Sequence, residues 1–253
     1  MKEIPFTENS QRSGGASLHS LLGIDVPRDR VISLVGAGGK TTILYYLAHE
    51  LAALGNRVAV STTTHIFYPQ AQECESVVTD GNPEEIDDAL NQKQLVAVGT
   101  PAGEGKLSAP GSGVLDYLHS AADCLLIEAD GSHRMPVKMP NKTEPVIYPK
   151  TDRIVAVAGL SALGKPLGRA CHRAALAEEL LGAGEESLLS GQDLARMLLH
   201  GYRGCDAVVL NQADTAPLRE QGAQIAALLL ESGIPRVAVT SFSGGRLSGF
   251  SVQ

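Results

Sequence analysis

The distribution of hydrophobic residues along the chain predicts buried strands that alternate with amphipathic helices. Apolar positions three and four residues apart predict helices from Lys40 to Gly55, from Asn82 to Asn91, and over 173–181, 190–200 and 217–231. Short apolar runs predict buried strands at Arg30–Val35, Val58–Val60, Glu75–Thr79, Gln94–Val98, Cys124–Ile127, Ile154–Ala158, Ala207–Leu210 and Val237–Val239. This alternation predicts an α/β fold in which helices flank a mainly parallel sheet, giving three layers.

The same pattern predicts a short arm and one folded domain. Residues 1–29 show no sustained hydrophobic period, which is typical of a peripheral N-terminal arm, and residues 30–253 are expected to form a single domain. Five glycines between positions 99 and 113 predict a surface loop. Segment 130–175 has four prolines between positions 136 and 149, and we expect it to form a lid or a substrate-binding insertion.

Composition and charge narrow the class of protein. The 253 residues include 21 basic and 28 acidic side chains, a net charge of −7, so we expect no nucleic-acid partner. No apolar stretch approaches the roughly 20 residues of a membrane helix, and the first residues lack the apolar segment of a signal peptide. The four cysteines form no C-x-x-C pair, which favours a cytoplasmic protein.

A glycine-rich turn between the first strand and the first helix has the parts of a phosphate-binding loop. Its glycines let backbone N–H groups face an anion, the helix N-terminus adds partial positive charge, and Lys40 supplies a mobile cation. Thr41 is the expected Mg²⁺ ligand. The spacing G-x-x-G-K-T-T is shorter than the usual G-x-x-x-x-G-K-[ST] and resembles the loop of Mur-type ATP-dependent ligases. The predicted phosphate site consists of Gly36, Ala37, Gly38, Gly39, Lys40, Thr41 and Thr42.

A second motif, LLIEADGSHR, ends a buried strand with Glu128 and Asp130 and resembles a Walker B element. Carboxylates at a strand end beside a phosphate loop hold Mg²⁺ or polarise an attacking water. Our hypothesis is that Asp130 binds the metal with Thr41, that Glu128 orients the nucleophile, and that Lys40 stabilises the transferring phosphoryl group. Either carboxylate remains a candidate for the metal.

A third motif, VVLNQAD, places Asn211 and Asp214 after a buried strand with the N-x-x-D spacing that GTPases use for guanine. Gln212 stands where those proteins have lysine, and the Mur-like loop favours adenine, so ATP and GTP both remain candidates. Thr240 and Ser241 fit a second base-binding element. A plain Asx turn is the alternative interpretation of Asn211.

Further polar side chains lie near strand ends or before a helix, where ligands of α/β proteins gather. The substrate candidates are Thr63, Thr64, His65, Lys138, His172 and Arg173. Lys138 with Glu144 would form a clamp on the lid. The alternatives are a strand-end threonine run, a proline-rich linker and a hydrogen-bonded structural histidine.

Taken in order, several segments resemble the YqeC-type selenium-dependent hydroxylase accessory family over about residues 30–240. The segments are VISLVGAGGKTT, STTTHI, IEADGSHRMPVKMP, EPVIYP, GLSALGKPL, CHRAALAEELLG and VVLNQAD. The resemblance implies a P-loop NTPase-like α/β protein associated with the maturation of selenium-dependent molybdenum hydroxylases. It transfers the nucleotide role to residues 36–42 and the acidic role to Glu128 and Asp130, whereas Lys138, His172 and Arg173 match positions without an assigned role.

Three functional hypotheses follow from these motifs. The first is a Mg²⁺-dependent maturation factor that binds and cleaves ATP or GTP and acts on a molybdenum hydroxylase apoenzyme or its cofactor. The second is a ligase or kinase that transfers a group to a small molecule. The third is a nucleotide-gated chaperone of the hydroxylase without turnover.

Overall fold

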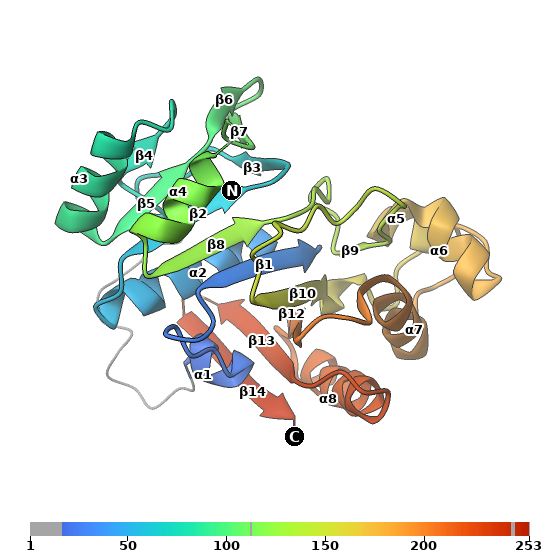
Figure 1. The fold of residues 1–253 in the computed structure, drawn as a ribbon. Coiled ribbons are helices and arrows are strands. Elements are labelled where there is room, and N and C mark those ends of the chain that lie inside the picture. Colours follow the sequence, from blue (N-terminus) through green and yellow to red (C-terminus); the bar gives the residue numbers. More distant parts are fainter. Residues whose placement is uncertain (1–16, 112, 244–245, 253) are drawn as a thin grey trace.

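Nine strands form the central sheet of the protein, whose computed structural model describes residues 17–111, 113–243 and 246–252 (Figure 1). The strand order is β14-β13-β12-β10-β1-β8-β2-β5-β4, and all neighbours are parallel except β13 and β14. The strands are β1 (Val31–Gly36), β2 (Val58–Thr62), β4 (Val77–Val78), β5 (Leu95–Val98), β8 (Cys124–Glu128), β10 (Arg153–Gly159), β12 (Ala207–Asn211), β13 (Val237–Ser243) and β14 (Arg246–Val252). The mainly parallel sheet predicted from the sequence is confirmed.

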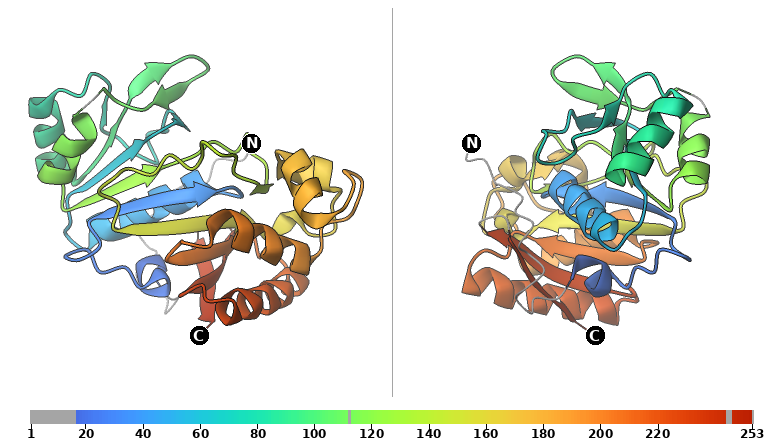
Figure 2. Two further views of the ribbon diagram at one scale, coloured as in Figure 1. Left: turned by 45° about the vertical axis from the view of Figure 1, so that its right-hand side comes forward. Right: turned by 90° about the vertical axis from the view of Figure 1, so that its left-hand side faces the viewer.

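Helices cover both faces of this sheet (Figure 2). Successive residues of β1 alternate between two apolar clusters: Ile32 and Leu34 pack with α1 and α2, whereas Val31 and Val35 pack on the opposite side. The helices are α1 (Leu18–Leu22), α2 (Lys40–Ala53), α3 (Pro83–Lys93), α4 (Val114–Ala121), α5 (Leu167–Ala170), α6 (Ala174–Leu181), α7 (Gly191–Tyr202) and α8 (Ala216–Glu231). Because β1 is the middle strand of the sheet order, the end of β1 lies at the centre of the sheet's carboxyl edge.

Side chains cap the starts of α3, α7 and α8. Asn82 accepts a hydrogen bond from the N–H of Glu84, and Pro83 occupies the first turn of α3, as the sequence predicts. Ser190 and Asp193 form a capping box at the start of α7. No side chain caps α2, whose N-cap is Gly39, and the same is true of α1, α4, α5 and α6. An uncapped helix start leaves N–H groups for another acceptor.

The glycine-rich stretch 99–113 differs from the predicted surface loop. It contains β6 (Thr100–Ala102) and β7 (Lys106–Ser108), which form a three-stranded sheet with β3 (His65–Phe67). Leu107 of β7 and Ile66 of β3 are both buried and lie in register. The many glycines hide this short apolar pairing in the sequence.

Two further segments differ from the predicted organisation. Leu18 and Leu22 of α1 are buried, so part of the expected peripheral arm packs against α2, while residues 1–16 lie outside the described residues. Within 130–175, β10 is a central strand. The parts outside the central sheet are 130–152 and 160–175, which include β9 (Val137–Lys138) paired with β11 (Cys171–His172). No helix among the described residues is long and apolar enough to cross a membrane.

Candidate functional site

Three glycines shape the turn that joins β1 to α2. Gly36, Gly38 and Gly39 have φ values of 92°, 79° and 112°, which L side chains rarely adopt. A Cβ atom on Gly38 would overlap the Gly159 nitrogen and come within 2.5 Å of the Pro136 carbonyl oxygen. The turn therefore needs glycine both for its conformation and for its packing.

The first amides of this turn donate to the protein itself. The N–H of Gly36 donates to Oδ2 of Asp130 (3.0 Å), that of Ala37 to the Val157 carbonyl (2.8 Å), and that of Gly38 to the Met135 carbonyl (3.2 Å). The N–H groups of residues 36–38 therefore face the protein, whereas the sequence led us to expect loop N–H groups that face an anion. The amides of residues 39–42, at the uncapped start of α2, are then the ones available to an anion.

Lys40 is a buried cation between two strand-end carboxylates. It is 3% exposed, and its Nζ donates to the Gly36 carbonyl (2.6 Å). The same Nζ lies 3.1 Å from Oδ1 of Asp130 and 3.8 Å from Oε1 of Glu128. A buried ammonium is stable only with such partners, so the two acids hold Lys40 at the loop.

Thr41 lies against Glu128. Its hydroxyl donates to Oε2 of Glu128 (2.9 Å). The sequence predicts Thr41 and Asp130 as joint ligands of a metal ion, and that assignment stays a prediction. Burial raises the pKa of Glu128, although the charge of Lys40 and the Thr41 hydrogen bond oppose that shift. A carboxylate with a raised pKa accepts a proton more readily at neutral pH.

A chain of alternating charges leads from the loop into the segment 130–175. Lys138 is buried, and its Nζ lies 3.2 Å from Oδ2 of Asp130 and 2.6 Å from Oε2 of Glu144. Arg173 Nη1 donates to the same Glu144 oxygen (2.6 Å). Burial alone would raise the pKa of Glu144, but the hydrogen bonds and charges of Arg173 and Lys138 outweigh it and hold the pKa at about 2. Lys138, Arg173 and Glu144 thus form one ionised cluster connected to Asp130.

The oxygen atoms at this edge fit a magnesium ion that is also bound by phosphate. Oδ1 of Asp130 is buried and receives no hydrogen bond from the described residues, although Lys40 is its ionic neighbour. Carboxylates and a hydroxyl are suitable Mg²⁺ ligands. In the described part of the chain, no group of three or more His, Cys, Asp or Glu side chains could hold a metal ion. A magnesium ion here would therefore need oxygens from a bound phosphate and from water.

Asn211 contacts the loop directly. Its side-chain amide donates to the Gly38 carbonyl (2.9 Å), and its Oδ1 accepts from the Thr240 hydroxyl (3.0 Å). Asp214 is exposed and accepts from Ser241 (2.5 Å). Gln212, which stands at the lysine position of the guanine motif, accepts from Ser161. Asn211 therefore lies beside the loop, whereas Asp214 has an accessible carboxylate.

The remaining candidates lie around the same edge but are not all in contact. Thr63 donates from its N–H to the Glu128 carbonyl (3.2 Å) and from its hydroxyl to the Val146 carbonyl (2.6 Å). The Thr64 hydroxyl is buried and has no partner among the described residues. His65 is exposed on β3. His172 on β11 lies opposite Lys138 on β9 in the backbone register of the two-stranded sheet.

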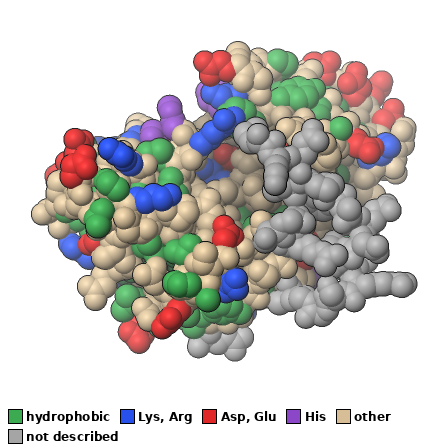
Figure 3. Space-filling view, turned by 180° about the vertical axis from the view of Figure 1, so that it is seen from behind, with side chains coloured by type: hydrophobic (Ala, Val, Ile, Leu, Met, Phe, Trp, Pro, Cys, Tyr) green, Lys and Arg blue, Asp and Glu red, His purple; other side chains and the backbone are tan. Residues whose placement is uncertain are grey.

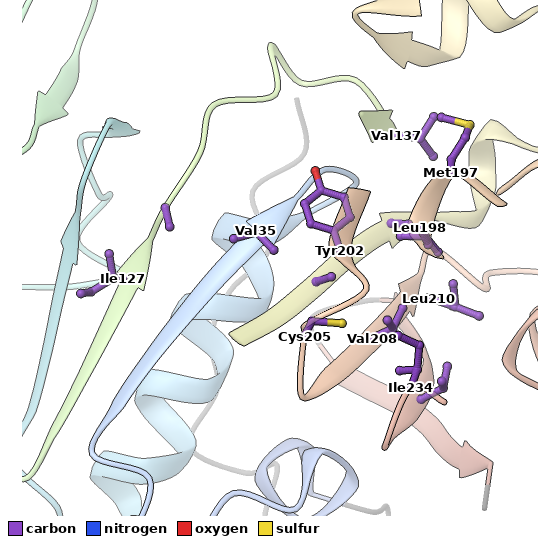
Figure 4. Close-up of a cluster of buried hydrophobic side chains, with 14 of the residues drawn as sticks. Val35, Ile127, Val137, Met197, Leu198, Tyr202, Cys205, Val208, Leu210 and Ile234 are labelled. Carbon is purple, nitrogen blue, oxygen red and sulfur yellow. The ribbon is translucent and has the colours of Figure 1, made fainter. Parts of the chain in front are cut away.

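The sequence interpretation missed two kinds of residue near this site. Tyr202 is buried, and its hydroxyl has no partner in the described part of the chain. Figure 4 shows this hydroxyl pointing away from Cys205 and Val208, toward the side of the cluster where β9 lies. His133 and Arg134 follow the acidic motif and have positive φ values of 50° and 60°. In the sequence, Tyr202 is only one more apolar position at the end of a predicted helix. His133 and Arg134 are not residues that predict a turn.

The parallel sheet, the glycine loop before α2 and the strand-end acids define a protein of the P-loop-type α/β fold class. The family model described as "YqeC protein" matches residues 32–175. An uncharacterized protein YqeC of Escherichia coli (strain K12) is 34% identical over 178 residues, which cover 68% of this chain and 69% of that protein. The chain therefore belongs to the YqeC family.

Solved structures with a similar arrangement share little sequence with the chain. FtsY from Mycoplasma mycoides is 15% identical with a TM-score of 0.44, and the match covers 89% of this chain and 65% of FtsY. Chloroplast FtsY from Physcomitrella patens is 13% identical with a TM-score of 0.45, and the match covers 88% of this chain and 62% of that one. HypB from Helicobacter pylori, solved in complex with nickel, is 13% identical with a TM-score of 0.41, and the match covers 86% of this chain and 80% of that one. The chain spans less than two thirds of either FtsY structure.

Proposed function

We propose that this protein binds a Mg²⁺–nucleoside triphosphate at residues 36–42 and hydrolyses its γ-phosphate. The observation that carries the proposal is the position of Lys40, which is buried beside Asp130 and Glu128 at the uncapped start of α2. A cation, free helix amides and strand-end carboxylates are the parts that phosphoryl transfer requires. Thr41 and Glu128 would hold the magnesium ion, with Asp130 close by. When bound, the ion would neutralise negative charge on the phosphates.

The chain's own residues account for the remaining steps. Lys40 exchanges its bond to the Gly36 carbonyl for the outer phosphate oxygens, while Asp130 keeps the N–H of Gly36 in place. A water oxygen forms a bond to the γ-phosphorus as the bond to the bridging oxygen breaks, which releases the nucleoside diphosphate. The proton of that water passes to an oxygen of the γ-phosphate, while Glu128, which lies against Thr41, orients the water.

The same site supports transfer to a small molecule as a second candidate. In that reaction a hydroxyl or carboxylate oxygen of the acceptor replaces water, and Lys138, His172 and Arg173 would lie on the acceptor side. The cluster of Lys138, Glu144 and Arg173 favours this candidate because it connects the loop to the segment 130–175. Mass spectrometry of the products distinguishes free phosphate from a phosphorylated acceptor.

The biological role follows from the family resemblance and is proposed on that basis. The protein would act in the maturation of a selenium-dependent molybdenum hydroxylase, by contact with its apoenzyme or its cofactor. A nucleotide-gated chaperone without turnover remains the alternative. Complex formation that depends on nucleotide but proceeds without phosphate release would favour the chaperone.

The decisive experiment compares Lys40→Ala with a control that disturbs a similar ion pair elsewhere. Arg153, the first residue of β10, has its Nε 3.0 Å from Oδ2 of the buried Asp29. Arg153→Met therefore removes a comparable cation at a site outside the loop. Each change removes one of two cations beside a buried acid, because Arg28 stays 3.3 Å from Asp29 and Lys138 stays 3.2 Å from Asp130, so both variants should lose stability. Calorimetric titration with ATP and GTP, each with Mg²⁺, is made below the melting temperature of both variants.

We expect wild type and Arg153→Met to bind nucleotide and to release phosphate, and Lys40→Ala to do neither. Native turnover in Lys40→Ala would refute the assigned site. Absence of binding by the wild-type protein would refute nucleotide binding by the isolated chain.

A further inference from the structure

The turn after the acidic motif has an unusual backbone. The Met135 N–H donates to the Ser132 carbonyl (3.0 Å), and both central residues, His133 and Arg134, have positive φ. Two positive φ values are the signature of a type I′ turn, which favours Asn, Asp and Gly at these positions. His and Arg are disfavoured there, so the backbone is strained at the place where it presents two basic side chains.

Each of these two side chains is held in place by a ring contact with a different element. The rings of His133 and His172 stack with centroids 4.6 Å apart and an angle of 17°. The Arg134 guanidinium lies 4.4 Å from the ring centroid of Phe67 on β3. The turn thus spans from β3 to β11, with both of its side chains exposed.

The turn rests directly on the phosphate loop. The Gly38 N–H donates to Met135, and the Gly159 N–H donates to the Pro136 carbonyl (2.7 Å). Figure 3 shows, from behind, histidine side chains beside Lys and Arg side chains along the upper left of the molecule. A ligand bound to the turn would therefore lie close to the loop.

The basic groups of the turn lack an acidic partner. Among the described residues, Arg134, His133 and His172 make no ion pair with a carboxylate, whereas nearby Lys106 pairs with Glu104 and Arg173 pairs with Glu144. This is notable in a chain with 28 acidic and 21 basic residues. Burial lowers the pKa of His172; the charges of Arg173, His133 and Lys138 lower it further, and the charge of Glu144 opposes them. Exposed basic groups held in place without an acid are suited to an external anion.

We infer that His133, Arg134 and His172 form a binding site for the oxyanion, phosphate or carboxylate, of a second small-molecule substrate beside the nucleotide. The anion site itself stands on this geometry; only its description as a substrate site rests on the proposed function. Arg134 would supply the paired donors, and the two imidazoles would supply N–H groups. The strain of the turn is the local cost of presenting these side chains.

The test replaces the turn with the sequence that its backbone prefers. The double variant His133→Asn with Arg134→Gly keeps the type I′ conformation and removes the basic side chains, so its melting temperature should equal or exceed that of wild type. Its control, His119→Asn with Arg203→Gln, removes the same residue types elsewhere. Inorganic phosphate and citrate are titrated calorimetrically into each protein at saturating Mg²⁺–ADP.

We expect at least one of the two anions to bind wild type and the control, and to bind the turn variant about 10- to 100-fold more weakly, as the loss of charge-assisted hydrogen bonds predicts. The preferred anion identifies a phosphate ester or a carboxylate as the ligand class. Undiminished binding by the turn variant, or no binding by wild type, would overturn the inference. Equal loss of Mg²⁺–ADP binding in the turn variant would also overturn it, because the turn would then belong to the nucleotide site.

Failure of the nucleotide proposal gives a different result. If wild type does not bind Mg²⁺–ADP, the titration is repeated in the Lys40→Ala background, where the loop has lost its cation. Anion binding there that depends on His133 and Arg134 supports the anion site without a nucleotide site. If the turn substitutions leave the anion affinity unchanged in this background, the inference is wrong.

Discussion

The side-chain amide of Asn211 donates to the carbonyl oxygen of Gly38, 173 positions away in the chain, at 2.9 Å. Its other side-chain atom accepts from Thr240 on β13. Asn211 therefore connects β12 and β13 to the middle of the phosphate loop. In the proposed nucleotide site, this contact would give Asn211 a positioning role that does not depend on the base.

Asn211→Ala should weaken ATP and GTP binding equally. The change leaves the buried Gly38 carbonyl and Thr240 hydroxyl unsatisfied, at a cost of about 1–3 kcal/mol each. Thr240→Val, which removes only the contact with Oδ1, serves as the control and should affect nucleotide affinity less. Calorimetric titration checks both; a loss confined to GTP would instead show direct reading of the base.

Asp214→Asn tests base selection. The Asp214 carboxylate is exposed and held by Ser241, so it is free to accept from a guanine ring N–H and amino group. We expect the variant to lose about 10- to 100-fold in GTP affinity, as expected for hydrogen bonds to a charged group, and to keep its ATP affinity. Unchanged affinity for both nucleotides would remove Asp214 from the base site.

Gly38→Ala should abolish nucleotide binding and destabilise the fold. A Cβ there meets backbone atoms of Gly159 and Pro136, which cannot rotate away. Gly55 has a φ of 92°, but a Cβ added to it would have nothing within 4 Å, so Gly55→Ala isolates the cost of positive φ alone, about 1–2 kcal/mol. Thermal unfolding should show a larger loss for Gly38→Ala, and similar losses would argue against a crowded loop.

Glu144 should make a pH-dependent contribution to stability. Its folded-state pKa of about 2 lies below its ordinary value of 4.5, so the contribution is complete above about pH 4.5 and is lost as the pH falls toward 2. The difference in melting temperature between wild type and Glu144→Gln should therefore narrow over that range. Glu104→Gln, which alters an exposed pair with Lys106, should change little at any pH. A constant gap for Glu144→Gln would contradict the ion cluster.

Much of the fold follows from local patterns in the sequence. The apolar runs predict the central strands because those strands are buried on both faces, and Asn82 predicts the start of α3 because capping is local. The pairing of β3 with β7 joins residues some 40 positions apart in the chain, and composition gives no sign of it. The burial of α1 likewise depends on α2, which the first 29 residues do not encode.

The sequence predicts which residues belong to the candidate site but not which of them contact one another. Residues 36–42 and the acids follow from strand-end motifs, whereas the partner of Thr41 depends on sheet register. Glu128 pairs with Leu34, which faces α2, so the Glu128 side chain lies on the side where Thr41 begins that helix. The register of β8 against β1 is set by packing across the whole sheet, and a single sequence does not specify it.

The inward bonds of the loop's first three amides have a consequence for the speed and cost of recognition. Because Asp130, Val157 and Met135 already fix Gly36, Ala37 and Gly38, the chain has ordered this backbone during folding. In the proposed site, a phosphate at the start of α2 would meet backbone that is already ordered, and little conformational entropy would be lost on binding. Association would be limited by the release of Lys40 from its acidic neighbours, a single side-chain movement, and not by rearrangement of the loop.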